Sequence, residues 1–196
     1  MSKQTLVTTA DQRTWPADKD ESVLFLGEWC KRFNQKRKWE DLNAHVFQYH
    51  WDDREKLVSD YAFLQDVYEN ILASLAKKLN KIHSVDHSVR YWRILIGPWL
   101  LIFIQILFDR WRTVHDALQD PLVEKCIIFE RNSFSLVPND IAHFYKLFIE
   151  DDWNEGIYSQ LLQMYFSDKI NLIKITHEEN VNSEEVFNKF GFLSKA

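Results

Sequence analysis

The chain has 196 residues, enough for one domain of ordinary size, and its 46% hydrophobic and 15% aromatic fractions exclude a disordered protein. Its formal net charge is −5, and it lacks the basic stripe of a general nucleic-acid-binding surface, so no nucleic-acid partner is expected. Two cysteines, Cys30 and Cys126, cannot build a disulfide framework, which makes the reducing cytoplasm the default location.

Three strand-like segments come first in the chain, at residues 4–9, 23–27 and 44–49. Each runs directly into a polar loop that carries aromatic residues. If the strands are parallel, the three loops open on one edge of the sheet, at the carboxyl ends of the strands. Open α/β sheets bind their ligands at that edge. The pattern therefore predicts a binding site there.

Helical periodicity follows from residue 53 to about residue 83, where apolar side chains recur every three or four positions. A second helix is expected to begin near Val89, or to restart at Pro98, and to end near Leu118. Its apolar run, 94–108, is shorter than the roughly 20 residues that cross a bilayer. We interpret it as a buried helix of a soluble domain. Peripheral membrane insertion, helped by the basic run 31–38, and a true span are the alternatives.

Further strands are expected at 125–130 and 170–175, with helices at about 138–150, 153–166 and 183–189. Strands separated by long helices favour an α/β layered fold with a mostly parallel sheet. We therefore predict one Rossmann-like, helix-rich domain over residues 1–196, with a peripheral tail from about residue 176. The strand order is not revealed by the sequence.

The loop after the third strand offers a candidate base. His50 stands at the carboxyl end of a strand beside carboxylates and could deprotonate a hydroxyl group. A hydrogen-bonded structural histidine is the plainer alternative. Asp52 or Asp53 could cap the following helix, because a carboxylate accepts the free N–H groups of a first turn.

The first two loops offer further candidates. Asp11 could act as a base and Arg13 could clamp an anionic group, although an Asp11–Arg13 turn with Trp15 packed on the sheet would also fit. Glu28 could contact a sugar hydroxyl or act as a base, and Trp29 could stack on a sugar face. Neither a GxGxxG nor a GxxxxGK[ST] string occurs, which argues against dinucleotide enzymes and P-loop NTPases.

Arg90 and Arg93 fall on one side of a helical turn, where they could face an anionic ligand or pair with Asp86 and the carboxylates of the third loop. The seven histidines and two cysteines show no zinc-type ligand spacing, so no metal site is expected.

Several strings resemble a family of bacterial transferases associated with O-antigen and other surface-polysaccharide loci. They are residues 8–16 (TTADQRTWP), 24–30 (LFLGEWC), 49–54 (YHWDDR) and 91–99 (YWRILIGPW). The resemblance runs from Gln4 to at least Asp109. Members look longer than this chain, which resembles their amino-terminal part.

The resemblance implies a glycosyltransferase-like enzyme with two Rossmann domains, of which this chain would be the acceptor-side half. Such enzymes need no obligatory metal or cofactor, since the activated sugar donor is a substrate held mainly by the other domain. A carbohydrate acceptor and a donor-binding domain or second chain are the implied partners. The location would be cytoplasmic, at most peripherally in contact with the inner face of the membrane.

In this interpretation each predicted site residue has a role. The base would be Asp11, Glu28 or His50. Substrate groups would be bound by the remaining candidates: Arg13, Trp15, Trp29, Trp51, Asp52, Asp53, Arg54, Arg90 and Arg93. The alternative is a non-catalytic binding or assembly module that docks a partner chain or a membrane surface.

Overall fold

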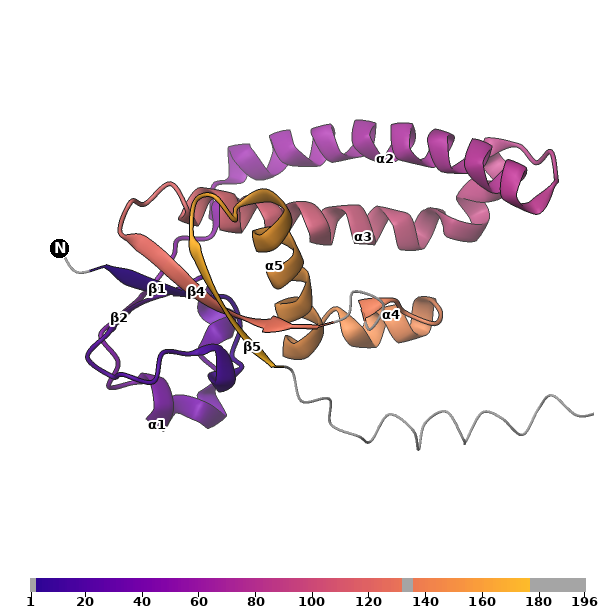
Figure 1. The fold of residues 1–196 in the computed structure, drawn as a ribbon. Coiled ribbons are helices and arrows are strands. Elements are labelled where there is room, and N and C mark those ends of the chain that lie inside the picture. Colours follow the sequence, from indigo (N-terminus) through magenta and orange to yellow (C-terminus); the bar gives the residue numbers. More distant parts are fainter. Residues whose placement is uncertain (1–2, 132–135, 177–196) are drawn as a thin grey trace, which may run out of the picture.

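A five-stranded, fully parallel sheet forms the centre of the protein, as the computed structural model of residues 3–131 and 136–176 shows (Figure 1). The strand order is β3-β2-β1-β4-β5. The strands are β1 (Gln4–Val7), β2 (Ser22–Phe25), β3 (Ala44–Val46), β4 (Val123–Glu130) and β5 (Asn171–Thr176). The α/β, Rossmann-like fold and all five predicted strands are confirmed, whereas the helix expected at 183–189 lies outside the described residues.

Short turns after β1 and β2 cover one face of the sheet. Four 3₁₀ turns and one short helix follow the first three strands: η1 (Gln12–Thr14), η2 (Glu28–Cys30), η3 (Phe33–Gln35), α1 (Lys36–Trp39) and η4 (His50–Asp52). The core on this face is formed by Val7, Trp15, Val23, Phe25 and Cys30. Burial raises the pKa of the Cys30 thiol to about 12, so this cysteine is a core residue rather than a nucleophile.

Two helices, α3 (Val89–Ala117) and α5 (Asp151–Tyr165), cover the opposite face (Figure 1). Their buried side chains Val114, Tyr158 and Leu162 pack on Leu6 and Leu24 of the sheet. The chain passes from β1 through β2 to β3 on one side, and then crosses to β4 and β5 on the other side of β1. The strand order therefore reverses between β1 and β4. In open α/β sheets this reversal opens a crevice beyond the carboxyl ends of the central strands.

A long helical hairpin extends away from the sheet (Figure 1). Its arms are α2 (Arg54–His83) and α3 (Val89–Ala117). Asp53 caps α2, since its carboxylate accepts the N–H groups of Glu55 and Lys56, as predicted for one of the two aspartates. Helix α3 begins at Val89 after the Ser88 cap, and Pro98 lies inside it, so a restart at Pro98 is wrong.

The apolar run of α3 is less buried than its composition suggested. One side packs on Leu64, Tyr68 and Leu72 of α2. In its most apolar 18-residue window only 22% is buried, and Ile94 remains 70% exposed. By length and composition alone, α3 is the one helix in the described part of the chain that could cross a membrane.

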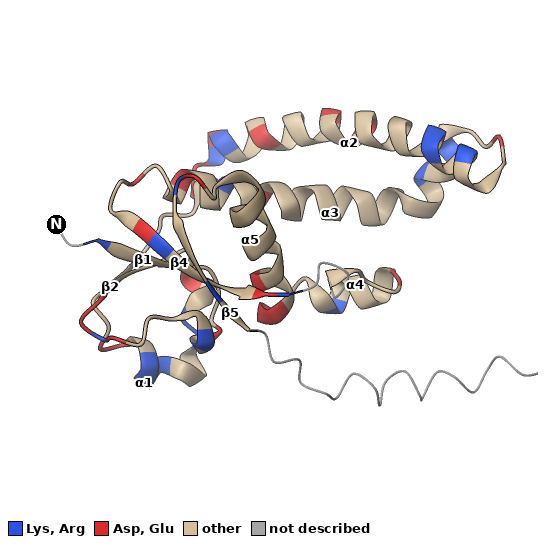
Figure 2. Cartoon of the chain, in the orientation of Figure 1, with Lys and Arg blue, Asp and Glu red and all other residues tan. Residues whose placement is uncertain are grey.

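The last two described helices are α4 (Ile141–Leu147) and α5 (Asp151–Tyr165). Phe144 of α4 is fully buried and packs edge-on against Trp99 and Phe103 of α3. Figure 2 shows the charged residues over this framework: basic residues gather on α1 and at the far end of the hairpin, and acidic residues mark the first turn of α5.

Asp116, near the end of α3, links the two arms of the hairpin, because it binds Lys56 of α2 and two basic residues of α3. It accepts from Lys56 Nζ at 3.0 Å, Arg112 Nε at 2.9 Å and His115 Nδ1 at 3.0 Å. Burial would raise the pKa of Asp116, but these hydrogen bonds outweigh it and lower the pKa from 3.8 to about 2. A lowered pKa means that the ionised group stabilises the folded state above pH 4, and that this stabilisation disappears between about pH 4 and pH 2.

Replacing Asp116 by Asn should therefore lower the free energy of unfolding by about 1–2 kcal/mol at pH 5, and by much less near pH 2. Urea unfolding of both proteins across this range measures the difference. Asp66→Asn, at an exposed position of α2, serves as the control. If the stability difference between the native protein and Asp116→Asn stays constant with pH, the lowered pKa of Asp116 is contradicted.

Candidate active site

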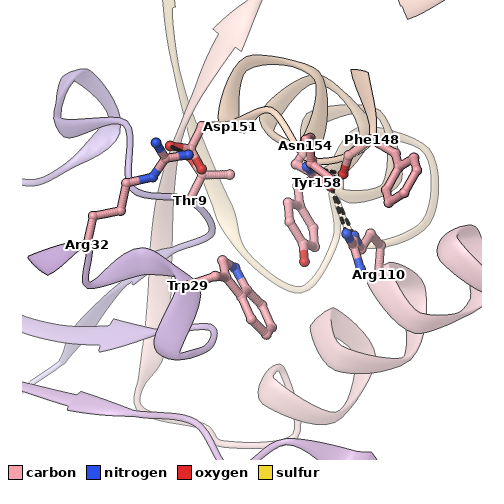
Figure 3. A pocket seen from close by; sticks show the side chains of 9 residues that line it. Thr9, Trp29, Arg32, Arg110, Phe148, Asp151, Asn154 and Tyr158 are labelled. Carbon is pink, nitrogen blue, oxygen red and sulfur yellow. Dashed lines mark hydrogen bonds and ion pairs between the residues drawn. The ribbon is translucent and has the colours of Figure 1, made fainter. Parts of the chain in front are cut away.

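Two adjacent cavities lie at the carboxyl edge of the sheet, beside the point where the strand order reverses. The first has a volume of about 480 Å³, and the second about 390 Å³. Thr9 after β1 and Trp29 of η2 line the first cavity from the sheet, and Arg110 of α3 lines it from the helical layer. Its other lining residues are Arg32, Phe148, Ile149, Asp151, Asn154 and Tyr158 (Figure 3).

The two cavities share Arg32 and Asp151, which form an ion pair with an N–O distance of 2.6 Å. Asp151 opens α5, and Arg32 precedes η3, so the pair joins the turn layer to the helical layer. Burial raises the pKa of the Asp151 carboxyl, and the charge of Arg32 only partly offsets that rise. Asp151 can thus exchange a proton closer to neutral pH than an exposed aspartate would.

Trp29 reaches the first cavity because Gly27 leaves room for its ring. A Cβ atom at Gly27 would lie 2.2 Å from the Trp29 ring, so no other residue type fits without moving the indole. The indole Nε1 donates to the Thr8 carbonyl at 2.9 Å, and the side chain is still 37% exposed. This placement gives the cavity an anchored aromatic face of the kind that packs on sugar rings.

Arg110 is held on the opposite side of the same cavity (Figure 3). Its Nε and Nη2 atoms donate to Asn154 Oδ1 at 3.1 and 3.0 Å, and its Nη1 atom pairs with Asp109. Burial would lower the pKa of Arg110, but the neighbouring Tyr158 and Asp109 outweigh it and raise the pKa. Arg110 is therefore a fixed cation with a set orientation.

A buried polar network supports Arg110 from behind. Asp109, only 4% exposed, accepts from Tyr49 Oη at 2.6 Å and lies 3.1 Å from His50 Nε2. Burial would raise the pKa of Asp109, but His50, Arg110 and Tyr49 together hold it below the usual value. The carboxylate thus stays ionised and neutralises Arg110.

His50 belongs to this network rather than to the surface of either cavity. Its side chain is 1% exposed, and its Nδ1 has no hydrogen-bond partner among the described residues. This matches the plainer alternative, a hydrogen-bonded structural histidine, although His50 still connects to the cavity through Asp109 and Arg110. The other two residues expected as bases, Asp11 and Glu28, lie outside this network.

Asp11 lines the second cavity and caps η1, but its carboxylate is engaged by Arg13. Arg13 Nε and Nη2 donate to the two carboxylate oxygens, with the shortest distance at 2.6 Å, and its guanidinium lies 4.5 Å from the Phe129 ring centre. The hydrogen bond to Asp11 outweighs burial and raises the pKa of Arg13. Glu28 points to solvent and pairs with Lys31 at 2.9 Å.

Two tryptophans predicted to stack on sugars, Trp15 and Trp51, pack against other side chains of the protein. Trp15 is 8% exposed, packs edge-on against Phe25 and donates its indole N–H to the Thr9 carbonyl. Trp15 thus packs on the sheet, as the alternative predicted, and its role in sugar stacking stays a prediction. Trp51 donates to Asp60 and stacks with Phe108, between the first turns of α2 and the middle of α3.

The remaining predicted residues also line neither cavity. Asp52, Asp53 and Arg54 sit at the start of α2, where Asp53 is the helix cap. Arg90 and Arg93 lie in the first turns of α3, at the far end of the hairpin, and Arg93 forms a bidentate pair with Glu69. The structure brings Asp11 and Trp29 to the edge cavities, and it separates Arg90 and Arg93 from them.

Of the residues that line the first cavity, the sequence predicted only Trp29, and those it missed include Arg32, Arg110, Asp151, Asn154 and Tyr158. Asn154 and Tyr158 are four residues apart on α5, a spacing that puts both on one helix face. Arg32 lies within the basic run 31–38, which the sequence connected with membrane contact and not with a cavity. Among residues 3–131 and 136–176, no group of three His, Cys, Asp or Glu side chains could hold a metal ion. The expectation of a metal-independent reaction stays a prediction.

Comparisons with known proteins agree with the sequence resemblance at the level of a transferase. No curated protein and no solved structure matches the chain. A family model described as LIC12162 family transferase matches residues 4–195, almost the whole chain. The chain therefore belongs to the LIC12162 family of transferases.

Proposed function

We propose that this chain is the acceptor-side half of a glycosyltransferase-like enzyme. The enzyme would transfer a sugar-like group from an activated donor to a carbohydrate hydroxyl, in the synthesis of surface polysaccharide such as O-antigen. A second Rossmann domain or partner chain would bind most of the donor. Membership of a transferase family and an edge cavity in a Rossmann-like fold are the starting points.

One observation carries the proposal: the 480 Å³ cavity combines an anchored aromatic face with fixed hydrogen-bonding groups. Trp29 offers the apolar face, whereas Arg110, Asn154 and Tyr158 stand on other walls (Figure 3). A carbohydrate has apolar C–H faces and a rim of hydroxyl groups, and so it fits such a lining. The volume suits a small ligand.

Asp151 is the best-placed base for this reaction. It lines both cavities, and burial raises its pKa, which makes the carboxylate a stronger base than that of an exposed aspartate. In the proposed step the acceptor hydroxyl gives its proton to the Asp151 carboxylate. The acceptor oxygen bonds to the anomeric carbon while the bond from that carbon to the leaving group breaks, and the leaving group departs with the electron pair. Asp11, on the second cavity, is held by Arg13 at both carboxylate oxygens. Asp151 is paired with Arg32, so in the proposed step its carboxylate is shared between Arg32 and the acceptor hydroxyl.

Replacing Trp29 by Ala should weaken carbohydrate binding at least roughly tenfold, because an anchored aromatic residue at the centre of a site carries much of the binding energy. Saturation-transfer NMR with a panel of neutral and acidic mono- and oligosaccharides identifies the ligand, and titration gives the affinity. Phe33→Ala is the matched control, since Phe33 is an 86% exposed aromatic residue nearby that lines neither cavity.

Binding that is lost in Trp29→Ala and kept in Phe33→Ala supports the cavity as the acceptor site. If no saccharide binds the native protein, or if both variants bind like the native protein, the acceptor-side assignment is wrong. Thermal unfolding of both variants checks that the fold is retained.

A further inference from the structure

The far end of the α2–α3 hairpin, residues 77–95, projects away from the sheet (Figure 1). Asn80 fixes it by accepting from Trp92 Nε1 at 2.8 Å and from the His87 N–H at 3.1 Å, and by donating to the His87 carbonyl. Ser84 ends α2 in the left-handed conformation, with φ of 55°. We call residues 77–95 the hairpin tip.

The hairpin tip is strongly basic, although the whole chain is acidic. It holds five basic residues and a single acidic one, Asp86, which gives a formal charge of +4 against −5 for the whole chain. The basic residues, all exposed, are Lys77, Lys78, Lys81, Arg90 and Arg93 (Figure 2). Of these five cations, only Arg93 has an ion-pair partner among the described residues, and the other four face solvent.

Exposed apolar side chains lie among these cations. Ile82 is 72% exposed, Ile94 is 70% exposed and Leu95 is 56% exposed. Val85, Val89 and Tyr91 are each more than a third exposed. Such side chains are costly to leave in water as a group, and in a soluble protein a patch of this kind marks a docking surface.

The combination of unpaired cations and protruding aliphatic side chains fits one partner in particular, an anionic lipid bilayer. Its surface attracts each nearby lysine or arginine by about 1 kcal/mol, and its boundary layer accepts apolar side chains to a depth of about 5–10 Å. We propose that the hairpin tip docks on an anionic membrane surface, with Ile82, Ile94 and Leu95 entering the headgroup layer and the tip cations contacting lipid phosphates. This inference does not depend on the proposed function.

The basic run 31–38 is a weaker candidate for the same contact. Three of its five cations are neutralised, because Lys31 pairs with Glu28, Arg32 with Asp151 and Lys36 with Glu40. Arg32 also belongs to the cavity wall. The run lies on α1 and the turns before it, at the opposite end of the molecule from the hairpin tip (Figure 1).

Vesicle co-sedimentation of the full chain tests the proposal, with phosphatidylcholine vesicles compared with mixed phosphatidylcholine–phosphatidylglycerol vesicles at low and high salt. Lys77→Glu/Lys78→Glu should weaken binding to the mixed vesicles by roughly 30-fold or more, the equivalent of two lost cation–surface contacts. Arg37→Glu/Lys38→Glu changes the net charge equally on α1 and should have little effect.

A second pair of variants tests the apolar part of the contact. Ile94→Ser should weaken vesicle binding roughly tenfold. Val58→Ser removes a side chain of matching exposure, 69%, near the sheet end of α2 and should bind like the native protein.

Several results would overturn the proposal: no binding to mixed vesicles at low salt, equal binding to neutral vesicles, or a larger loss for the α1 variant than for the tip variant. A further overturning result would come from analytical ultracentrifugation, which measures self-association of the chain. If the tip changes reduce self-association while vesicle binding is absent, the surface docks a second copy of the chain instead. Saccharide binding should be unaffected by all four variants, which separates this test from the proposed function.

Discussion

Replacing Asp109 by Ala is expected to lower the free energy of unfolding by about 3–5 kcal/mol. The native carboxylate is buried and joins Tyr49, His50 and Arg110. Its removal leaves Arg110 as a largely buried cation whose nearest anion is gone, and leaves the Tyr49 hydroxyl without its acceptor. Urea unfolding at neutral pH measures the loss.

Two further variants separate the loss of the charge pair from the loss of packing. Asp66→Ala removes an exposed aspartate on α2 and should change stability by well under 1 kcal/mol. Asp109→Leu combined with Arg110→Met removes both charges and should recover part of the stability lost in Asp109→Ala. If the double variant is less stable than the single one, the orphaned-charge explanation fails.

Replacing Asp151 by Asn is expected to reduce sugar transfer by about 10²- to 10⁴-fold, the usual contribution of a positioned base. The measurement is release of the leaving group from nucleotide-activated sugars by native and variant chains, each combined with the second domain or partner chain that binds the donor, in the presence of the saccharide that binds this chain. Burial raises the pKa of Asp151, so native turnover should fall as the pH drops through this raised pKa, because the protonated carboxyl cannot accept the hydroxyl proton. In Asp151→Asn that acidic limb should disappear.

Asp152→Asn is the matched control for this experiment. Asp152 is the next residue along the first turn of α5, lines the second cavity and not the first, and pairs with Arg131. It should keep turnover within a few-fold of the native protein, and both variants should bind saccharide. Native turnover with an intact acidic limb in Asp151→Asn would assign the base to another residue and leave the acceptor site itself in place.

The local elements of this protein follow from its sequence because their causes are local. Apolar runs bounded by polar loops produce β1 to β5, and a stripe of apolar residues at three- and four-residue spacing produces α2. Asp53 and Ser88 begin α2 and α3 where their side chains can accept the free N–H groups of a first turn. The same apolar runs placed the loops after β1 and β2 at the carboxyl edge of the sheet, where Asp11 and Trp29 line the two cavities.

The composition of the site was decided by the tertiary structure. Strand order depends on how the helices pack on the two faces, and no local pattern encodes it. His50 and Asp109 are 59 residues apart, and only the folding of α3 back along α2 brings them to 3.1 Å. Arg110, Asp151 and Asn154 reach the cavity from helices whose sequences show only that they have a buried face.

The length of α2 explains why the predicted arginines do not reach the site. At 1.5 Å per residue, a helix of 30 residues is about 45 Å long, so the start of α3 lies that far from the edge where α2 begins. Arg90 and Arg93 follow the break between α2 and α3, and they therefore lie at the hairpin tip, far from the cavities. The sequence by itself determined which segments become strands and helices, because hydrophobic period and capping act within a few residues. Only the tertiary structure decided which side chains share the cavity, because that depends on long-range packing across the sheet.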